Sequence, residues 1–161
     1  MVWGRSFRAA LLGQSEDSSD YCGELLNAVK IFERLNEPYA LAGAVASMYY
    51  GRARFTEELE FVTSGKLTEL LALKLGNSVR FWDDASSKEI IARARQADLE
   101  GYSIKIVEPH DLIAMKLRVG RLEDDYDISQ IVQNTAIDDS HLQQRVTPEQ
   151  FQHFLDVKKR K

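Results

Sequence analysis

The sequence of 161 residues contains one cysteine, three prolines and no long apolar run. A single cysteine cannot form a disulfide within the chain, which fits a reducing compartment such as the cytoplasm. No segment approaches the roughly 18 consecutive apolar residues of a membrane-spanning helix, so we expect no membrane contact. The N-terminal "MVWGRSFRAALLGQ" is too short and broken in its apolar part for a signal peptide. We therefore expect a cytoplasmic protein.

Positive charge does not predominate, since 21 Lys and Arg residues stand against 25 Asp and Glu residues. The formal net charge of -4 argues against broad coating of nucleic acid. Basic residues gather locally instead, at Arg52 and Arg54, at Lys116, Arg118 and Arg121, and in the C-terminal "KKRK".

The composition is that of an ordinary globular protein, with 44% apolar and 29% charged residues. The length predicts one domain over residues 1–161, with a core over about 20–133 and C-terminal helices over about 139–158.

Periodicity predicts strands that alternate with helices. Strands are expected at 39–42, 59–62, 78–82 and 102–107, and helices at 24–35, 44–50, 66–75, 86–95, 108–119, 123–132 and 147–157. Ser86 with Glu89, and Thr147 with Gln150, have the spacing of capping boxes. The predicted class is α+β, a small mixed sheet with helices packed on it and a helical C-terminal part.

The stretch "AGAVASMYYGRARFTEELEFV" (42–62) contains the best candidate site. Gly43 ends a predicted strand and leads into a helix, an arrangement that binds phosphate through free backbone N–H groups. Glu58 and Glu60 share one face of the next strand, and paired carboxylates suit Mg²⁺ or Mn²⁺. The alternative interpretation is two glutamates on the solvated face of a strand.

Two ordered blocks resemble the core motif of the nucleotidyltransferase superfamily, which has the polymerase-beta-like fold. The first block comprises Gly43-Ala44-Val45-Ala46, Gly51, Arg54, Thr56 and Glu58-Leu59-Glu60-Phe61. The second is "IKIVEPHDLIAMKLRVGRLEDDYDI" at 104–128. Within the superfamily, the sequence resembles the small bacterial branch of AbiE-type toxins and other minimal nucleotidyltransferases.

The resemblance implies a role for each matching residue. Glu58 and Glu60 would be the catalytic pair that binds the divalent metal, with Asp83, or its neighbour Asp84, as the third acid. The implied nucleotide-binding residues are Gly43, Ala44, Arg54, Lys116 and Arg121. Arg54 is either a phosphate contact or the counter-charge of the glutamates. Asp124 and Asp127 are interpreted as structural acids paired with nearby bases.

Two functions remain open from the sequence. The first is metal-dependent transfer of a nucleotidyl group from a nucleoside triphosphate to a hydroxyl of RNA, protein or a small molecule. The second is a catalytically degenerate fold that acts as a binding or regulatory module, as in a toxin–antitoxin pair. The second follows from glutamates where the family uses aspartate, and from Ala44 where it uses glycine or serine.

A partner protein or a homodimer is a further expectation. It would use the first eleven or so residues and the C-terminal helix, where Phe151, Phe154 and Leu155 lie on one side. The alternative interpretation of these apolar residues is ordinary core packing.

Overall fold

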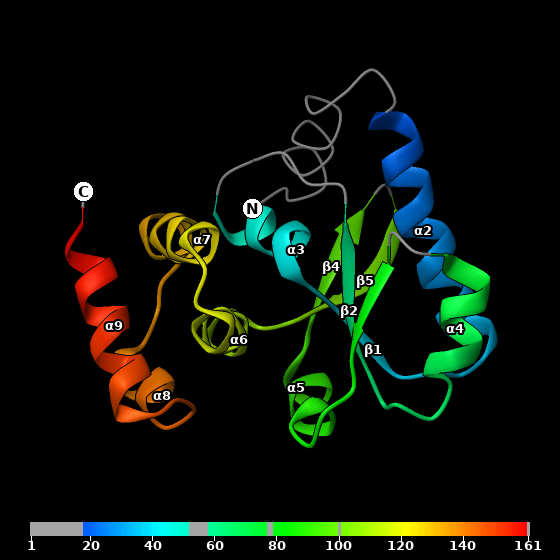
Figure 1. The fold of residues 1–161 in the computed structure, drawn as a ribbon. Helices are drawn as coiled ribbons and strands as arrows, with labels where there is room; N and C mark the ends of the chain where they lie inside the picture. The colour runs from blue at the N-terminus through cyan, green and yellow to red at the C-terminus, as the bar shows by residue number, and fades with distance from the viewer. Residues whose placement is uncertain (1–17, 52–57, 77–78, 100, 161) are drawn as a thin grey trace.

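A five-stranded mixed sheet organises the chain in a computed structural model that describes residues 18–51, 58–76, 79–99 and 101–160 (Figure 1). The strand order is β3-β2-β1-β5-β4, with β1 at Tyr39–Ala42, β2 at Leu59–Thr63, β3 at Val79–Trp82, β4 at Arg95–Leu99 and β5 at Tyr102–Ile106. The described helices are α2 (Ser18–Arg34), α3 (Gly43–Tyr50), α4 (Thr68–Leu75), α5 (Ser87–Arg93), α6 (Pro109–Val119), α7 (Leu122–Asn134), α8 (Asp139–Gln143) and α9 (Pro148–Lys159). The predicted α+β class with a mixed sheet is confirmed.

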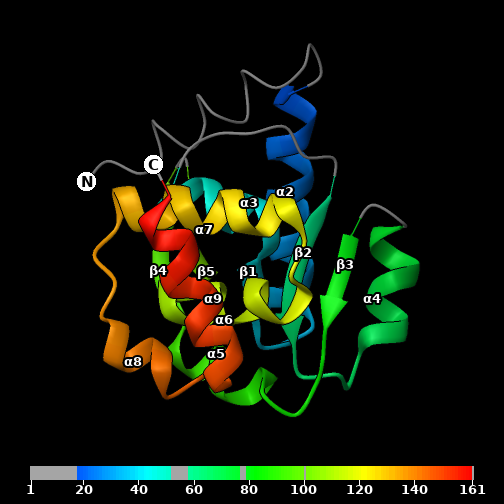
Figure 2. The ribbon, with the colours of Figure 1, turned by 60° about the vertical axis from the view of Figure 1, so that its left-hand side comes forward.

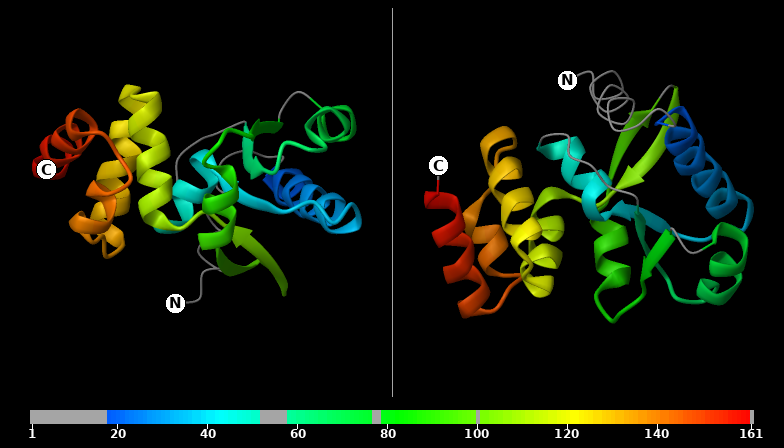
Figure 3. Two further views of the ribbon diagram at one scale, coloured as in Figure 1. Left: turned by 90° about the horizontal axis from the view of Figure 1, so that it is seen from below. Right: turned by 45° about the horizontal axis from the view of Figure 1, so that its top comes forward.

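The helices form layers on both faces of the sheet. Helices α2 and α4 lie on one side, α3 and α6 lie on the other, and α7, α8 and α9 continue outward from α6 (Figures 1 and 3). Among the described residues, no helix combines the length and apolar character that a membrane crossing requires.

Alternation along the strands sorts side chains between the two layers. Leu59 and Phe61 are 1% and 0% exposed, as the period of two predicts. The Phe61 ring packs edge-on against Phe32 of α2 at 4.8 Å, and Phe32 stacks on Tyr39 at 4.9 Å. The face of β2 that carries Glu60 is therefore turned away from this aromatic cluster, and Glu58 immediately precedes the strand.

Strand direction positions the end of β1 at the start of β2. The two strands are antiparallel and pair Ala42 with Glu60. Gly43, the next residue, has a φ of +66° and begins α3. The predicted strand-to-helix turn is present: the strand ends at Ala42 as expected, and α3 begins at Gly43, one residue earlier than expected.

Most predicted elements are present, and three details differ. β4 was missed, because the helix expected over 86–95 ends at Arg93 and the chain then forms a hairpin with β5. The capping box at Ser86 is wrong, since the Ser86 hydroxyl bonds Asp84 instead. Helix α2 begins at Ser18, earlier than the expected residue 24. The box at Thr147 and Gln150 is confirmed.

The C-terminal helix α9 packs on the core. Phe154 is fully buried, and Phe151 and Leu155 are partly buried against the same cluster. This favours the core-packing interpretation of their apolar face. The first eleven residues, the other expected partner surface, lie outside the described part of the chain.

Candidate functional site

A pocket of about 580 Å³ opens where β2, β3, α3, α6 and α7 meet. This volume is within the range of small-molecule binding pockets. Its lining comprises Gly43 and Ala44 of α3, Glu58 and Glu60, Arg80, Phe81 and Trp82 of β3, Leu112, Met115, Lys116 and Val119 of α6, and Arg121, Glu123 and Asp124. Figure 2 shows the start of α7 beside β2, in front of the sheet. The pocket thus brings together most of the residues that the sequence indicated.

The two glutamates are oriented by β3. Because β3 runs parallel to β2 and pairs Arg80 with Glu60, Arg80 and Trp82 share the face of the carboxylates. The Trp82 indole N–H donates to Glu60 Oε2 at 3.1 Å. Arg80 forms an ion pair with Glu58 Oε1 at 3.0 Å. Both Arg80 and Trp82 were missed by sequence reasoning, and only their alternation could have indicated a shared face.

Gly43 touches Glu60 directly. A Cβ atom added at Gly43 would lie 2.7 Å from Glu60 Cδ and 2.9 Å from Glu60 Cβ. These separations are shorter than carbon atoms tolerate, and a positive φ is also unfavourable for residues with a side chain. Glycine therefore allows the carboxylate to approach the first turn of α3.

Lys116 is buried between two aspartates. Its Nζ lies 2.8 Å from Asp127 Oδ2 and 3.6 Å from Asp124 Oδ1. The side chains of Lys116, Asp124 and Asp127 are at most 6% exposed. This confirms the ion pairing predicted for Asp124 and Asp127.

Arg121 reaches the pocket from the N-terminus of α7. Its Nε donates to Asp124 Oδ2 at 3.0 Å, a bond that raises the pKa of Arg121. Burial alone would raise the pKa of Asp124, but hydrogen bonds from Arg121 and the charge of Lys116 lower it overall. Asp124 therefore stays ionised and holds both cations at the pocket wall.

Asp83 lies away from this pocket. It follows the C-terminal end of β3, which pairs with Val62 rather than with the start of β2. Its Oδ2 accepts from Thr68 Oγ1 at 3.0 Å, and Asp84 pairs with Ser86 and Arg118. The parallel strands thus separate Asp83 from the carboxylate pair, which corrects the expectation that it completes the site. Arg54 lies outside the described residues.

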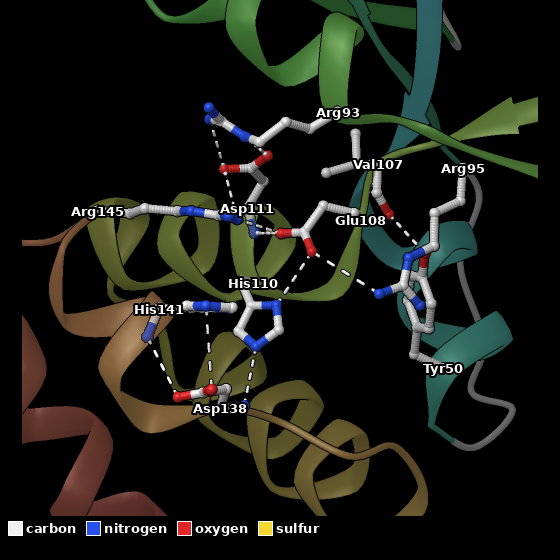
Figure 4. Close-up of polar contacts among 10 residues, drawn as sticks. All are labelled: Tyr50, Arg93, Arg95, Val107, Glu108, His110, Asp111, Asp138, His141 and Arg145. Carbon is white, nitrogen blue, oxygen red and sulfur yellow. Dashed lines mark hydrogen bonds and ion pairs between the residues drawn. The ribbon is translucent and has the colours of Figure 1, made fainter.

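A second polar cluster joins the sheet to the C-terminal helices (Figure 4). The Glu108 carboxylate accepts from the Asp111 amide at 2.7 Å, from His110 Nδ1 at 3.0 Å and from Arg145. Arg93 binds both carboxylate oxygens of Asp111, at 2.8 and 3.0 Å. Sequence reasoning missed this cluster, whose members come from α5, α6 and the segment after α8.

The interactions of this second cluster indicate a structural role. The Asp138 amide donates to His110 Nε2 at 2.9 Å, so both ring nitrogens of His110 have partners. Burial would raise the pKa of Glu108, but its hydrogen bonds and the charge of Arg145 lower it. The cluster therefore ties α6 and α8 together, and the candidate site remains the pocket at Glu60.

Comparison with known proteins finds one family match and a similar solved structure. A family described as "Nucleotidyl transferase of unknown function (DUF2204)" matches residues 81–160. A similar solved structure is that of an antigenic nucleotidyltransferase-like protein from Paracoccidioides brasiliensis, 15% identical, with a TM-score of 0.57. The match covers 97% of this chain and 89% of that one.

The family match over residues 81–160 and the shared fold together support a place in the nucleotidyltransferase superfamily. The likeness to the Paracoccidioides brasiliensis protein supports the fold, while the family match covers the C-terminal half, including α6 and α7. A comparison with curated proteins finds no match. The AbiE-type branch within the nucleotidyltransferases stays a prediction.

Proposed function

We propose that the pocket binds a nucleoside triphosphate with Mg²⁺ or Mn²⁺ and transfers its nucleotidyl group to an acceptor hydroxyl. The observation that carries this proposal is the direct contact of Gly43, at the start of α3, with Glu60, in a pocket that Glu58 also lines. A helix N-terminus binds phosphate, and neighbouring carboxylates bind the cation that accompanies it.

The residues fit a cation that is shared with the substrate. Within the described ranges, no group of three or more His, Cys, Asp or Glu residues could hold a metal by itself. Magnesium is usually held by one or two carboxylates together with substrate phosphates. Glu58 and Glu60 can supply such a pair, so binding of metal and binding of nucleotide should depend on each other. Bound metal would neutralise the charge that develops on the phosphates.

The basic residues of the pocket wall support a polyanionic ligand. Arg121 is 55% exposed, so its guanidinium can reach a phosphate while Asp124 holds it. Lys116 already forms ion pairs with Asp124 and Asp127. We therefore assign it to positioning α7 rather than to direct phosphate binding. The acceptor remains open among RNA, protein and a small molecule, and a cytoplasmic location fits the single cysteine.

The alternative is a degenerate module that binds a nucleotide or a partner without catalysis, as in a toxin–antitoxin pair. The observation that favours it is the ion pair of Arg80 with Glu58, which sets a protein cation beside the proposed metal ligands. The two functions predict different effects of Mn²⁺ and of changes at Glu60.

The test measures transfer of labelled nucleotide beside thermal melts with Mn²⁺ and a nucleoside triphosphate. In an active enzyme, Glu60→Gln should lower the transfer rate by on the order of a hundredfold, because it removes a charge that holds the metal. Glu69→Gln, an exposed change on α4 outside the pocket, is the matched control and should leave transfer unchanged. A wild-type protein without transfer, whose melt ignores metal and nucleotide, would contradict the proposal.

A further inference from the structure

Arg80 occupies the position beside the carboxylate pair on the neighbouring strand. It lies directly opposite Glu60 in the parallel ladder, and its guanidinium pairs with Glu58 at 3.0 Å. Trp82, two residues further along β3, holds Glu60 from the same face. The described pocket wall therefore presents two carboxylates and a guanidinium side by side.

A guanidinium at this position limits how many metal ions the pocket can accept. Arginine stays charged at all physiological pH values, so it repels a cation that approaches Glu58 from the side of β3. A metal bound by Glu58 and Glu60 would leave no further carboxylate of β3 for a second one, since Asp83 lies at the other end of that strand.

Arg80 is also the basic side chain of the described pocket lining that can most easily change partner. Its side chain is 65% exposed, compared with 55% for Arg121 and 6% for Lys116. Ion pairs as exposed as that of Arg80 with Glu58 are weak, so exchanging the carboxylate for another anion costs little. The planar guanidinium matches two phosphate oxygens at once.

We propose that Arg80 binds the triphosphate and serves as the second positive charge of the pocket, which then takes one divalent cation per nucleotide. This inference rests on the proposed binding of a metal–triphosphate complex. When the complex binds, Glu58 would hold the cation, and the guanidinium of Arg80 would move from Glu58 to phosphate oxygens. Arg80 is thus a substrate-positioning residue and sets the metal stoichiometry.

The test uses the full chain, Mn²⁺ and an α,β-imido analogue of ATP, in which the bond that nucleotidyl transfer would break is replaced. Calorimetry gives the affinity for the analogue, and electron paramagnetic resonance counts bound Mn²⁺ per chain. We expect one Mn²⁺ for the wild type. Arg80→Ala should weaken binding of the analogue about tenfold or more, because a charge-assisted pair of hydrogen bonds is lost. Arg80→Lys should restore part of the affinity.

Arg80→Asp adds a third carboxylate beside Glu58 and Glu60. We expect this variant to bind two Mn²⁺ ions per chain in the presence of the analogue. Arg34→Ala, an exposed arginine at the end of α2 outside the pocket, is the matched control and should behave as wild type. Circular dichroism checks that each variant folds.

Distinct results would overturn distinct claims. Two Mn²⁺ per wild-type chain, or unchanged affinity for the analogue in Arg80→Ala, would overturn the role of Arg80 and leave the proposed function intact. A wild type that binds neither Mn²⁺ nor the analogue would overturn both.

Discussion

The absence of a side chain at Gly43 controls the shape of the pocket beside Glu60. The φ of +66° at Gly43 and its contact with Glu60 each favour glycine for a separate reason. The first concerns the backbone of residue 43 alone, and the second concerns the carboxylate proposed to hold the metal. The two can be separated by substitution.

Gly43→Ala should lose stability and also weaken binding of Mn²⁺ and nucleotide. The positive φ costs roughly 1–2 kcal/mol with any side chain, and the added methyl group pushes Glu60 out of its position. Gly76→Ala is the matched control, because Gly76 has a φ of +78° but nothing lies within 4 Å of an added Cβ. Urea unfolding and calorimetry measure the two effects. If both variants bind the ligands equally well, the contact with Glu60 does not shape the site.

At the scale of elements, α6 and α7 are joined through the buried Lys116. The lysine on α6 contacts Asp124 and Asp127, which lie on the first turns of α7. Since Arg121 precedes α7 and bonds Asp124, the same joint orients the arginine that faces the pocket. Helix packing and pocket geometry are therefore coupled at Asp124.

Lys116→Met should lower the free energy of unfolding by about 3–5 kcal/mol, since it leaves two buried aspartates without their shared cation. Arg118→Met on the same helix is the control. In its ion pair with Asp84, the Arg118 side chain is 39% exposed and the Asp84 side chain is 43% exposed. Such exposed ion pairs contribute about 1 kcal/mol or less to stability. Chemical denaturation of both variants gives the comparison. Equal losses would mean that Lys116 contributes no more than a surface ion pair.

At the scale of the whole molecule, the cluster around Glu108 joins the sheet layer to the C-terminal helices. Glu108 follows β5 and caps α6, while Arg145 and the Asp138 amide approach from either end of α8 (Figure 4). The described core thus continues from the sheet into the helical part, and acid should weaken the connection.

Stability should fall with acid through Glu108. Its pKa lies below the ordinary value in the folded state, so its contribution is complete above the unfolded pKa of about 4.3 and is lost as pH falls toward the folded pKa. Glu108→Gln should be less stable at neutral pH and lose less on acidification between about pH 5 and pH 3. Glu149→Gln, an exposed change on α9, serves as control. Parallel pH curves of the wild type and Glu108→Gln, followed by thermal melts, would refute this role.

Local patterns in the sequence were enough to predict most helices and strands. The period of two along 59–62 correctly buried Leu59 and Phe61, and Pro148 after Thr147 marked the start of α9. The sequence patterns did not predict β4, because "RQADL" has little apolar alternation. The segment becomes a strand by pairing with β5 across the turn at Gly101. Such pairing depends on a partner strand and cannot be recognised in a short window.

The sequence by itself determined which residue types are available to the pocket: a glycine before a helix, a Glu-x-Glu strand and basic residues on two later helices. Tertiary structure alone decided which of them meet. Antiparallel pairing of β1 with β2 brings Gly43 to Glu60, while parallel pairing of β3 with β2 brings Arg80 there and carries Asp83 to the far end. The physical reason is that strand direction and register are set by contacts between distant segments, whereas periodicity reports only on neighbours within one segment.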